Sequence, residues 1–215
     1  MNKATGTGGR PTREESEQLS LRIIQVAHRL MLERGYAATS IEAIARAAGV
    51  AKRTLYDRFP DKRALFAAIL QHRLELNLFP GLEQAASETR DIEQALKSIG
   101  SHLLAVALTE DAIAMRRLIT AEAGRFPELQ TVLYEQGFSR LAACIEEILM
   151  RGVKSGELAI EDTGFAAEQF IHMVHGPVQC QATHGVKSCA VNEQRAYMAK
   201  VVDLFLNGCR PTQRL

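Results

Sequence analysis

Apolar residues recur at helical spacing along almost the whole chain. In the first such stretch, residues 13–34, one side of the expected helix is apolar and the other is polar. The apolar side consists of Ile23, Ile24, Ala27, Leu30 and Met31. Stretches with the alternating period of a strand do not occur in the sequence. The pattern therefore predicts an all-α protein of about nine helices joined by short connections.

Glycine, proline and capping residues divide this pattern into separate helices. Thr39-Ser40-Ile41-Glu42 fits a capping box with Thr39 as the cap, and Gly49 ends the short helix that follows. Pro80-Gly81 predicts a break, and Gly176-Pro177 predicts a kinked or shortened helix. The later helices are expected at about 51–59, 62–78, 91–108, 111–124, 127–151, 162–185 and 192–207.

Residues 40–59 predict a helix-turn-helix, because two short helices meet at a tight turn that contains Gly49. The apolar side of the first helix consists of Ile41, Ile44, Ala45 and Ala48. The second helix buries Leu55 and Phe59, and its other faces carry the donors that a helix in the major groove of DNA requires. A solvent-exposed basic helix in a helical bundle is the alternative interpretation of the same residues.

The charge distribution favours DNA as the partner of this segment. The whole chain has a net charge of +1. Residues 1–63 nevertheless hold twelve Lys and Arg against seven Asp and Glu, a balance of +5, and the remainder has a balance of −4. A basic segment on an acidic body indicates a polyanionic partner at one end only. Lys62 and Arg63 begin the next expected helix, where the helix dipole disfavours cations unless an anion such as a phosphate binds.

The composition limits the class of protein. Hydrophobic residues make up 47% of the chain, which is enough to form a folded core. No apolar run is long enough to span a bilayer, and residues 1–13 lack the apolar segment of a signal peptide. We therefore expect a cytoplasmic protein with no membrane partner. The motifs of P-loop, dinucleotide-binding, serine-hydrolase and zinc-peptidase enzymes are absent, so we expect no catalytic activity and no cofactor.

Residues 39–66 resemble the signature of the tetracycline-repressor (TetR) family. The motifs A-G-V, T-L-Y, F-P-x-K and A-L-F fall in register, and the similarity extends to R-G-Y at residues 34–36. The segments A-E-A-G-R-F-P-E-L at 121–129 and A-A-E-Q-F at 166–170 are similar to the C-terminal domain of an AcrR/AefR-like subgroup. The resemblance implies a three-helix DNA-binding domain at 13–63, a helical ligand-binding and dimerisation domain at 64–215, and a flexible arm at 1–12.

The same resemblance implies which residues contact a double-stranded DNA operator. Tyr56 and Lys62 match positions that bind phosphates, and Lys52 and Arg53 match positions that face base edges. The full expected set is Thr39, Ser40, Ala51, Lys52, Arg53, Thr54, Tyr56, Asp57, Arg58 and Lys62.

The chain departs from the family pattern at two of these positions. Ala51 stands where the family often has Ser or Thr, so the helix lacks a side-chain cap worth about 1 kcal/mol. Asp57 is an acid that either accepts a hydrogen bond from a cytosine amino group or pairs with an Arg. Upstream, Gly9-Arg10-Pro11 is interpreted either as an arm that places Arg10 in the minor groove or as a disordered tail.

The last two expected helices are apolar around most of their circumference, which predicts burial on more than one side. The resemblance implies that they form a four-helix interface in a homodimer. The expected interface residues are Phe165, Val174, Val178, Met198, Val201, Val202 and Phe205. Twofold symmetry then predicts a palindromic operator with half-sites about 34–36 Å apart, or a multiple of that distance.

The resemblance also implies an effector pocket among the central helices. The candidates are His102, Met115, Ile119, Phe126, Tyr134, Phe138, Gln169, Phe170, His172 and Met173. Each is alternatively an ordinary core residue. Together these features predict a transcription repressor that binds its operator as a homodimer and is released by a small lipophilic molecule, through a shift between conformers.

A regulator of the same fold that senses a metal or the redox state is the alternative. Its candidate residues lie close together in sequence: His172, His175, Cys180, His184 and Cys189. Their spacing matches no standard zinc site, so no metal is expected. The cysteines are otherwise expected to be buried free thiols.

Overall fold

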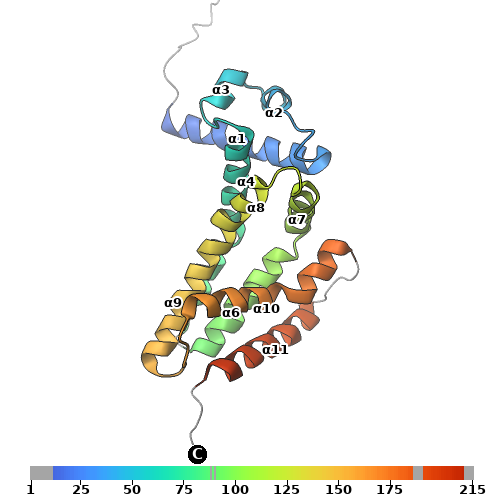
Figure 1. The fold of residues 1–215 in the computed structure, drawn as a ribbon. Helices are drawn as coiled ribbons and strands as arrows, with labels where there is room; N and C mark the ends of the chain where they lie inside the picture. The colour runs from blue at the N-terminus through green and yellow to red at the C-terminus, as the bar shows by residue number, and fades with distance from the viewer. Residues whose placement is uncertain (1–11, 88, 90, 186–190, 211–215) are drawn as a thin grey trace, which may run out of the picture. The chain divides into compact units, whose positions relative to one another are not determined.

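The computed structural model describes residues 12–87, 89, 91–185 and 191–210. Every regular element in these ranges is a helix, which confirms the all-α prediction (Figure 1). In chain order the elements are α1 (Arg13–Arg34), α2 (Ile41–Ala48), α3 (Lys52–Tyr56), α4 (Lys62–Asn77), α5 (Phe79–Ser87), α6 (Ile92–Ala107), α7 (Glu110–Glu122), α8 (Glu128–Leu133), the π-helical segment η1 (Tyr134–Phe138), α9 (Ser139–Ser155), α10 (Thr163–His184) and α11 (Val191–Cys209). None of the described helices is long and apolar enough to cross a membrane.

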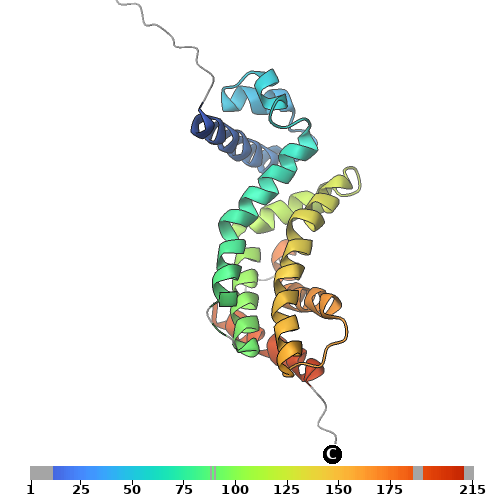
Figure 2. The same cartoon turned by 90° about the vertical axis from the view of Figure 1, so that its left-hand side faces the viewer.

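The chain divides into two compact units, Met1–Ile69 and Leu70–Leu215. The division falls inside α4, which Figure 2 shows as one continuous helix. The family resemblance implies a boundary at residues 63–64, in the first turn of the same helix. Of the arm expected at residues 1–12, only Thr12 is described, and Arg10 lies outside the described residues. Thr12 caps α1, because its hydroxyl accepts from the amide of Glu15 and the Glu15 carboxylate accepts from the amide of Thr12.

The core of the N-terminal unit forms where the apolar side of α1 packs against α2. Its fully buried side chains include Ile23, Met31, Ile44 and Leu55, which come from α1, α2 and α3. Phe66, on the first half of α4, completes this core: the Tyr36 ring meets it edge-on at a centroid separation of 5.6 Å. These residues hold α2 and α3 in place on a rigid base.

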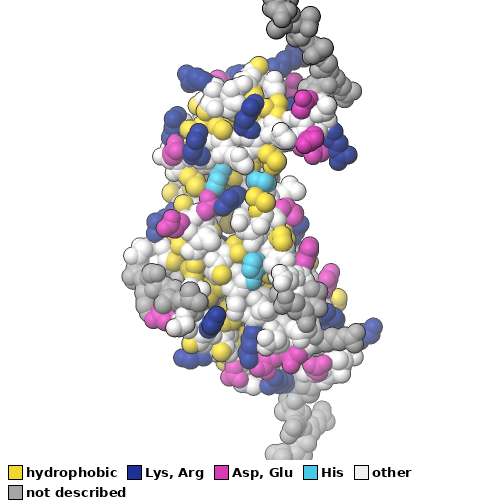
Figure 3. All heavy atoms as spheres, turned by 180° about the vertical axis from the view of Figure 1, so that it is seen from behind, with side chains coloured by type: hydrophobic (Ala, Val, Ile, Leu, Met, Phe, Trp, Pro, Cys, Tyr) yellow, Lys and Arg dark blue, Asp and Glu magenta, His cyan; other side chains and the backbone are white. Residues whose placement is uncertain are grey.

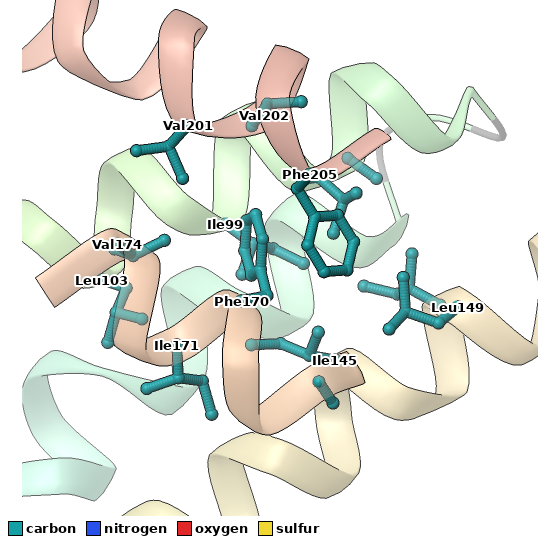
Figure 4. Packing of buried hydrophobic residues seen from close by; sticks show 14 of the residues in the cluster. Ile99, Leu103, Ile145, Leu149, Phe170, Ile171, Val174, Val201, Val202 and Phe205 are labelled. Atoms are coloured by element: carbon teal, nitrogen blue, oxygen red, sulfur yellow. The ribbon is translucent and has the colours of Figure 1, made fainter. Parts of the chain in front are cut away.

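The core of the C-terminal unit is shared by α6, α9, α10 and α11 (Figure 4). Phe170 of α10 and Phe205 of α11 meet edge-on with ring centroids 5.1 Å apart. Helix α6 approaches α11 closely at Gly100, where a Cβ atom would lie 2.5 Å from Met198 Sδ. A glycine is needed there for the two helices to pack, because the Met198 sulfur occupies the space that a larger side chain would need.

The break predicted at Pro80-Gly81 lies two residues earlier, at Leu78 between α4 and α5, and Pro80 belongs to a helix that the sequence pattern does not predict. Pro80 lies in the first turn of α5, and a first-turn residue needs no amide N–H because that group has no partner within the helix. The single long helix expected at 127–151 is instead divided into α8, η1 and α9. At the N-terminus of α2, Ser40 rather than Thr39 is the capping residue, so the capping box predicted from Thr39 is wrong.

Helix α10 is kinked at Gly176, as Gly176-Pro177 predicts: Gly176 has φ 22° and ψ −133°. Pro177 has no N–H with which to bond the carbonyl of Met173 one turn earlier. The hydroxyl of Tyr197, on α11, donates to that carbonyl at 2.5 Å. The side chain from a neighbouring helix thus replaces the hydrogen bond that the proline removes.

Candidate DNA-binding surface and ligand cavity

Local backbone chemistry sets the turn between α2 and α3. The Ser40 hydroxyl accepts from the amide of Ala43 at 3.1 Å and so begins α2. Gly49 ends it in the left-handed conformation, with φ 66°. Ala51 precedes α3 without a side-chain capping bond, as its methyl group requires. Helix α3 is shorter than the expected 51–59, since it ends at Tyr56 and a turn carries the chain to Phe59.

Helix α3 buries one side chain and exposes most of the others. Leu55 is fully buried, Thr54 is half-buried, and Tyr56 keeps 41% of its surface exposed. The remaining exposed positions of the expected contact set are Ser40, Ala51, Lys52, Arg53 and Asp57. Figure 3 shows Lys and Arg side chains at the surface of the N-terminal unit, interspersed with acidic ones. The exposed side of α3 therefore presents both cations and an aromatic hydroxyl to solvent.

The two adjacent cations of α3 differ in their partners. Lys52 forms an ion pair with Glu42 of α2, and its ammonium lies 5.6 Å from the centre of the Tyr56 ring. The hydrogen bond with Lys52 lowers the pKa of the Glu42 carboxyl and raises that of the Lys52 ammonium. Arg53 has no ion pair with any residue that the structure describes. Any other contact of the Lys52 ammonium requires its ion pair with Glu42 to open, whereas the Arg53 side chain needs no such change.

One of the expected DNA contacts, Thr39, is wrong because its side chain is buried, and a second, Arg58, is partly buried against α1. Thr39 is fully buried, and its hydroxyl lies 3.1 Å from the carbonyl oxygen of Leu30 and 2.8 Å from that of Gly35. It ties the end of α1 to the start of α2. Arg58 is half-buried, and its Nη2 donates to the hydroxyl of Ser16 on α1 at 2.9 Å. Both side chains hold the helix-turn-helix against α1.

Lys62 lies at the first turn of α4 with its ammonium 4.2 Å from the centre of the Tyr36 ring. The same ammonium donates to the carbonyl of Ala37 at 3.4 Å. The aromatic face and the carbonyl hold a cation at a helix N-terminus, where the dipole disfavours it. Its contact with a DNA phosphate stays a prediction.

A cavity of about 670 Å³ lies within the C-terminal unit, between α4, α6, α7, η1 and α10. Five of the residues expected in the effector pocket line it: Met115, Ile119, Tyr134, Phe138 and His172. The rings of Tyr134 and Phe138 are stacked at 5.5 Å, and Phe138 lies 5.2 Å from the imidazole of His172. The π-helical turn brings these two aromatic rings to the same wall.

The other expected pocket residues lie elsewhere. Phe170 is fully buried in the core, and Met173 packs against that core. His102 places Nε2 3.0 Å from the carbonyl oxygen of Leu78, beside Gly81. Gln169 is exposed, and Phe126 lies outside the cavity near Arg125. These positions follow from which side of each helix faces inward, and helical spacing alone does not reveal that side.

Several polar residues of the cavity lie outside the expected set. Arg73 of α4 pairs with Asp111 of α7 at 2.7 Å, and Arg116, His175 and Gln179 also line the cavity. Arg116 continues the apolar stripe of Ala112, Met115 and Ile119 on α7. The sequence signal that could have identified Arg116 as a cavity residue is its position as a cation within an apolar stripe.

His175 is the titratable group most strongly affected by this environment. Burial lowers its pKa from 6.5 to about 4, and the positive charge of Arg116 and the neighbouring His172 contribute in the same direction. The imidazole is therefore neutral at physiological pH.

The expected dimer interface needs correction at most of its positions. Val174, Met198, Val201, Val202 and Phe205 are buried in the core of the same chain, so they have almost no surface left for a partner, and Val178 is partly buried against that core. Phe165 is the exception, with 60% of its surface exposed. Among the large apolar side chains described on α11, Leu204 is exposed, at 68%. Sequence periodicity identifies apolar positions but not whether their partner is the same chain.

The cysteines and histidines of α10 form a small polar group. The Sγ atom of Cys180 lies 3.6 Å from Nδ1 of His184, which also lies 2.8 Å from the carbonyl oxygen of Cys180. Cys180 is exposed, while Cys144 and Cys209 are half-buried free thiols, so full burial was wrong for these three. Cys189 lies outside the described residues. Within the described ranges, no three His, Cys, Asp or Glu side chains gather as metal ligands would.

Comparison with known proteins bears on both units. Residues 23–69 match the family described as bacterial regulatory proteins, tetR family, and residues 94–208 match the AefR-like transcriptional repressor, C-terminal domain. The HTH-type transcriptional regulator AcrR from Shigella flexneri is 35% identical over 111 residues, which is 51% of this chain and 50% of that protein. The HTH-type transcriptional activator FasR from Mycolicibacterium smegmatis is 32% identical over 45% of this chain and 43% of that protein. The chain spans about half the length of these curated relatives.

Solved structures extend the similarity over nearly the whole chain. A protein from Mesorhizobium loti assigned to the TetR family has a TM-score of 0.78 and 28% identity, and the match covers 94% of this chain and all of that one. The flavonoid-responsive regulator FrrA has a TM-score of 0.76 and 29% identity, covering 91% of this chain and 99% of that one. The N-terminal helix-turn-helix and the helical C-terminal unit each match a domain of tetR-family regulators. The chain therefore belongs to the tetR family of bacterial DNA-binding transcription regulators.

Proposed function

We propose that this chain is a dimeric repressor that binds a palindromic operator through α3 and responds to a small apolar effector in the cavity of its C-terminal unit. One observation carries the DNA-binding part: α3 buries Leu55 and leaves Arg53, without a partner among the described residues, on its exposed side. An arginine in this state can form a bidentate pair with guanine O6 and N7 in the major groove.

Three of the remaining contact residues, Ser40, Tyr56 and Lys62, supply affinity rather than sequence preference. In this proposal Tyr56 and Lys62 bind phosphates, and such contacts position the protein on the duplex without reading its sequence. Ser40 stands at the start of α2, where free amides favour an anion. Lys52 exchanges its ion pair with Glu42 for DNA, and because that pair is exposed, little stability is lost.

The cavity supports the effector-binding part of the proposal. Its volume of about 670 Å³ lies within the usual range for small-molecule sites, and most of its lining is apolar. Helix α4 contributes Phe66 to the N-terminal core and Leu70 and Leu74 to the cavity wall. A ligand that favours one position of α4 therefore acts on the helix that also supports α2 and α3, and its differential affinity for the two conformers drives release.

The dimer in this proposal uses the exposed apolar side chains of the last two helices. Phe165 on α10 and Leu204 on α11 expose more of their surface than any other large apolar residue in the described ranges. Burial of both against a second copy would remove this apolar surface from water. A twofold dimer then requires an operator with two half-sites.

Selection of bound duplexes from a random DNA pool tests the DNA-binding part. We expect a palindromic consensus, affinity that falls as salt is raised, and loss of preference at one base pair in each half-site for Arg53→Ala. Arg125→Ala, a substitution of an exposed arginine in the C-terminal unit, is the matched control and should leave the consensus unchanged. If the purified protein selects no duplex, or if Arg53→Ala selects the same sites as the wild type, the assignment of α3 is wrong.

The direction of regulation is tested separately. The C-terminal match to an AefR-like repressor supports repression, whereas one relative of similar identity is named as an activator. A reporter gene placed behind the selected site should be silenced by the chain. Increased expression instead would identify an activator with the same DNA-binding surface.

A further inference from the structure

Arg116 places a cation in the wall of an otherwise largely apolar cavity. It follows Met115 on α7 and lies one turn from Ala112 and from Ile119, which line the same space. Burial lowers the pKa of its guanidinium, which indicates that the charge is partly removed from water. Such a charge is unfavourable unless an anion or strong hydrogen-bond acceptors lie beside it.

Protein groups compensate this charge only in part. With its amide oxygen turned toward the guanidinium, Gln179 accepts hydrogen bonds from Nε and Nη2 of Arg116 at 3.2 and 3.3 Å. No carboxylate in the described part of the chain forms an ion pair with Arg116. Asp111 already pairs with Arg73, and Glu168, which also lines the cavity, makes no ion pair with Arg116. The cavity therefore contains one cation whose counter-charge is missing.

A histidine provides a second polar contact beside this cation. His175 lies one turn before Gln179 on α10, lines the same cavity, and is close enough to Arg116 for the arginine to affect its titration. Its pKa of about 4 leaves the ring neutral at pH 7, and a neutral imidazole still has one N–H to donate. Arg116, Gln179 and His175 thus provide several N–H donors on the wall of the same cavity.

We propose that the effector is an apolar monoanion, a carboxylate on an aliphatic or aromatic body, whose anionic group binds Arg116 with the support of Gln179 and His175. This inference rests on the proposed function in taking the cavity as the effector site. A single charge is specified because Arg73, the other arginine of the lining, is already neutralised by Asp111. A charge-assisted pair between a guanidinium and a carboxylate is the stronger kind of hydrogen bond and gives a fixed orientation.

The rest of the lining selects the body of the ligand. It consists of aliphatic side chains and the stacked aromatic pair, among them Leu70, Leu74, Val106, Ile119, Tyr134 and Phe138. Such a surface favours a hydrocarbon chain or a ring system. It excludes a polyanion such as a nucleotide, because further negative charges would be buried without partners.

Two fluorescent probes that differ by one charged group test the proposal on the full chain. 1-Anilinonaphthalene-8-sulfonate is an anion, and N-phenyl-1-naphthylamine has the same rings without the sulfonate. We expect Arg116→Gln to weaken binding of the anionic probe by about 10- to 100-fold, the usual effect of losing a hydrogen-bonded charge, and to leave the neutral probe unchanged. Arg116→Lys should restore part of the loss, and Arg125→Gln, outside the cavity, should change neither probe.

A cavity-filling variant separates the two levels of the argument. Ala112→Trp should abolish binding of both probes, because Ala112 lines the cavity. If it does so while Arg116→Gln binds the anionic probe as well as the wild type does, the anion assignment is overturned and the effector site stands. If Ala112→Trp changes neither probe, the cavity is not the effector site, and both proposals fail.

Competition identifies the body of the ligand. Dodecanoate and 1-naphthoate are titrated against the anionic probe in wild-type protein and in Arg116→Gln. Displacement by dodecanoate alone indicates an aliphatic body, and displacement by 1-naphthoate alone indicates an aromatic one. Failure of both carboxylates to displace the probe overturns the proposal.

Discussion

Acidification should destabilise this protein through one partly buried histidine of the cavity wall, His175. Its pKa in the folded state is about 4, against an ordinary value of 6.5, so the unfolded chain binds a proton across this interval that the folded chain does not. Stability contributed by the neutral ring is fully present above pH 6.5 and is lost as the pH falls toward 4. Each unit of difference in pKa is worth about 1.4 kcal/mol, so the full effect is about 3 kcal/mol.

At pH 5 the free energy of unfolding has already fallen by about 2 kcal/mol through His175, while most carboxylates are still ionised. The free energy of unfolding is measured by guanidinium chloride titration, followed by circular dichroism at 222 nm, at pH 7.5 and pH 5. His175→Gln serves as the comparison, because glutamine keeps a polar side chain in the cavity but does not titrate. The wild type should lose about 2 kcal/mol more than His175→Gln between the two pH values.

The comparison with His175→Gln removes contributions from every other titratable group, which both proteins share. Equal losses in the two proteins would show that His175 is as hydrated in the folded chain as in the unfolded one. The cavity around Arg116 would then be filled with water at neutral pH, contrary to the burial on which the effector proposal relies.

Three further outcomes follow from single positions. Lys62→Ala should weaken DNA binding about equally for all sequences and reduce the slope of log affinity against log salt by about 1, as measured by fluorescence anisotropy; a changed consensus would contradict the phosphate assignment. Gly49→Ala should lower the unfolding free energy by about 1 kcal/mol, because φ is 66° there and nothing lies within 4 Å of the new methyl group; no change in chemical denaturation would contradict the left-handed turn. Tyr197→Phe should cost about 1–3 kcal/mol in the same assay, because it leaves the carbonyl of Met173 without its donor; a neutral result would mean that water takes the place of the hydroxyl.

The helices of this protein are largely a property of local sequence. The 3.6-residue period of apolar side chains, together with Gly49, predicts most helix boundaries to within a few residues, because helix formation and termination depend on neighbours along the chain. The kink at Gly176-Pro177 is local in the same sense, since it follows from a missing amide. The helix-turn-helix motif is therefore readable before any tertiary contact is known.

Tertiary structure decided which groups these helices bring together. Thr39 and Arg58 look like exposed polar residues in the sequence but are held by partners on α1, and Lys52 is paired with Glu42 ten positions away. The large apolar side chains described on α11 turn out to face the core of their own chain, except for Leu204.

The charge of Arg116 became informative only when the fold placed it against Gln179, more than sixty residues later in the chain and on another helix. The physical reason is the range of the interactions. Backbone hydrogen bonds and caps act over three or four residues, whereas burial and charge pairing depend on distances in space that local sequence does not fix.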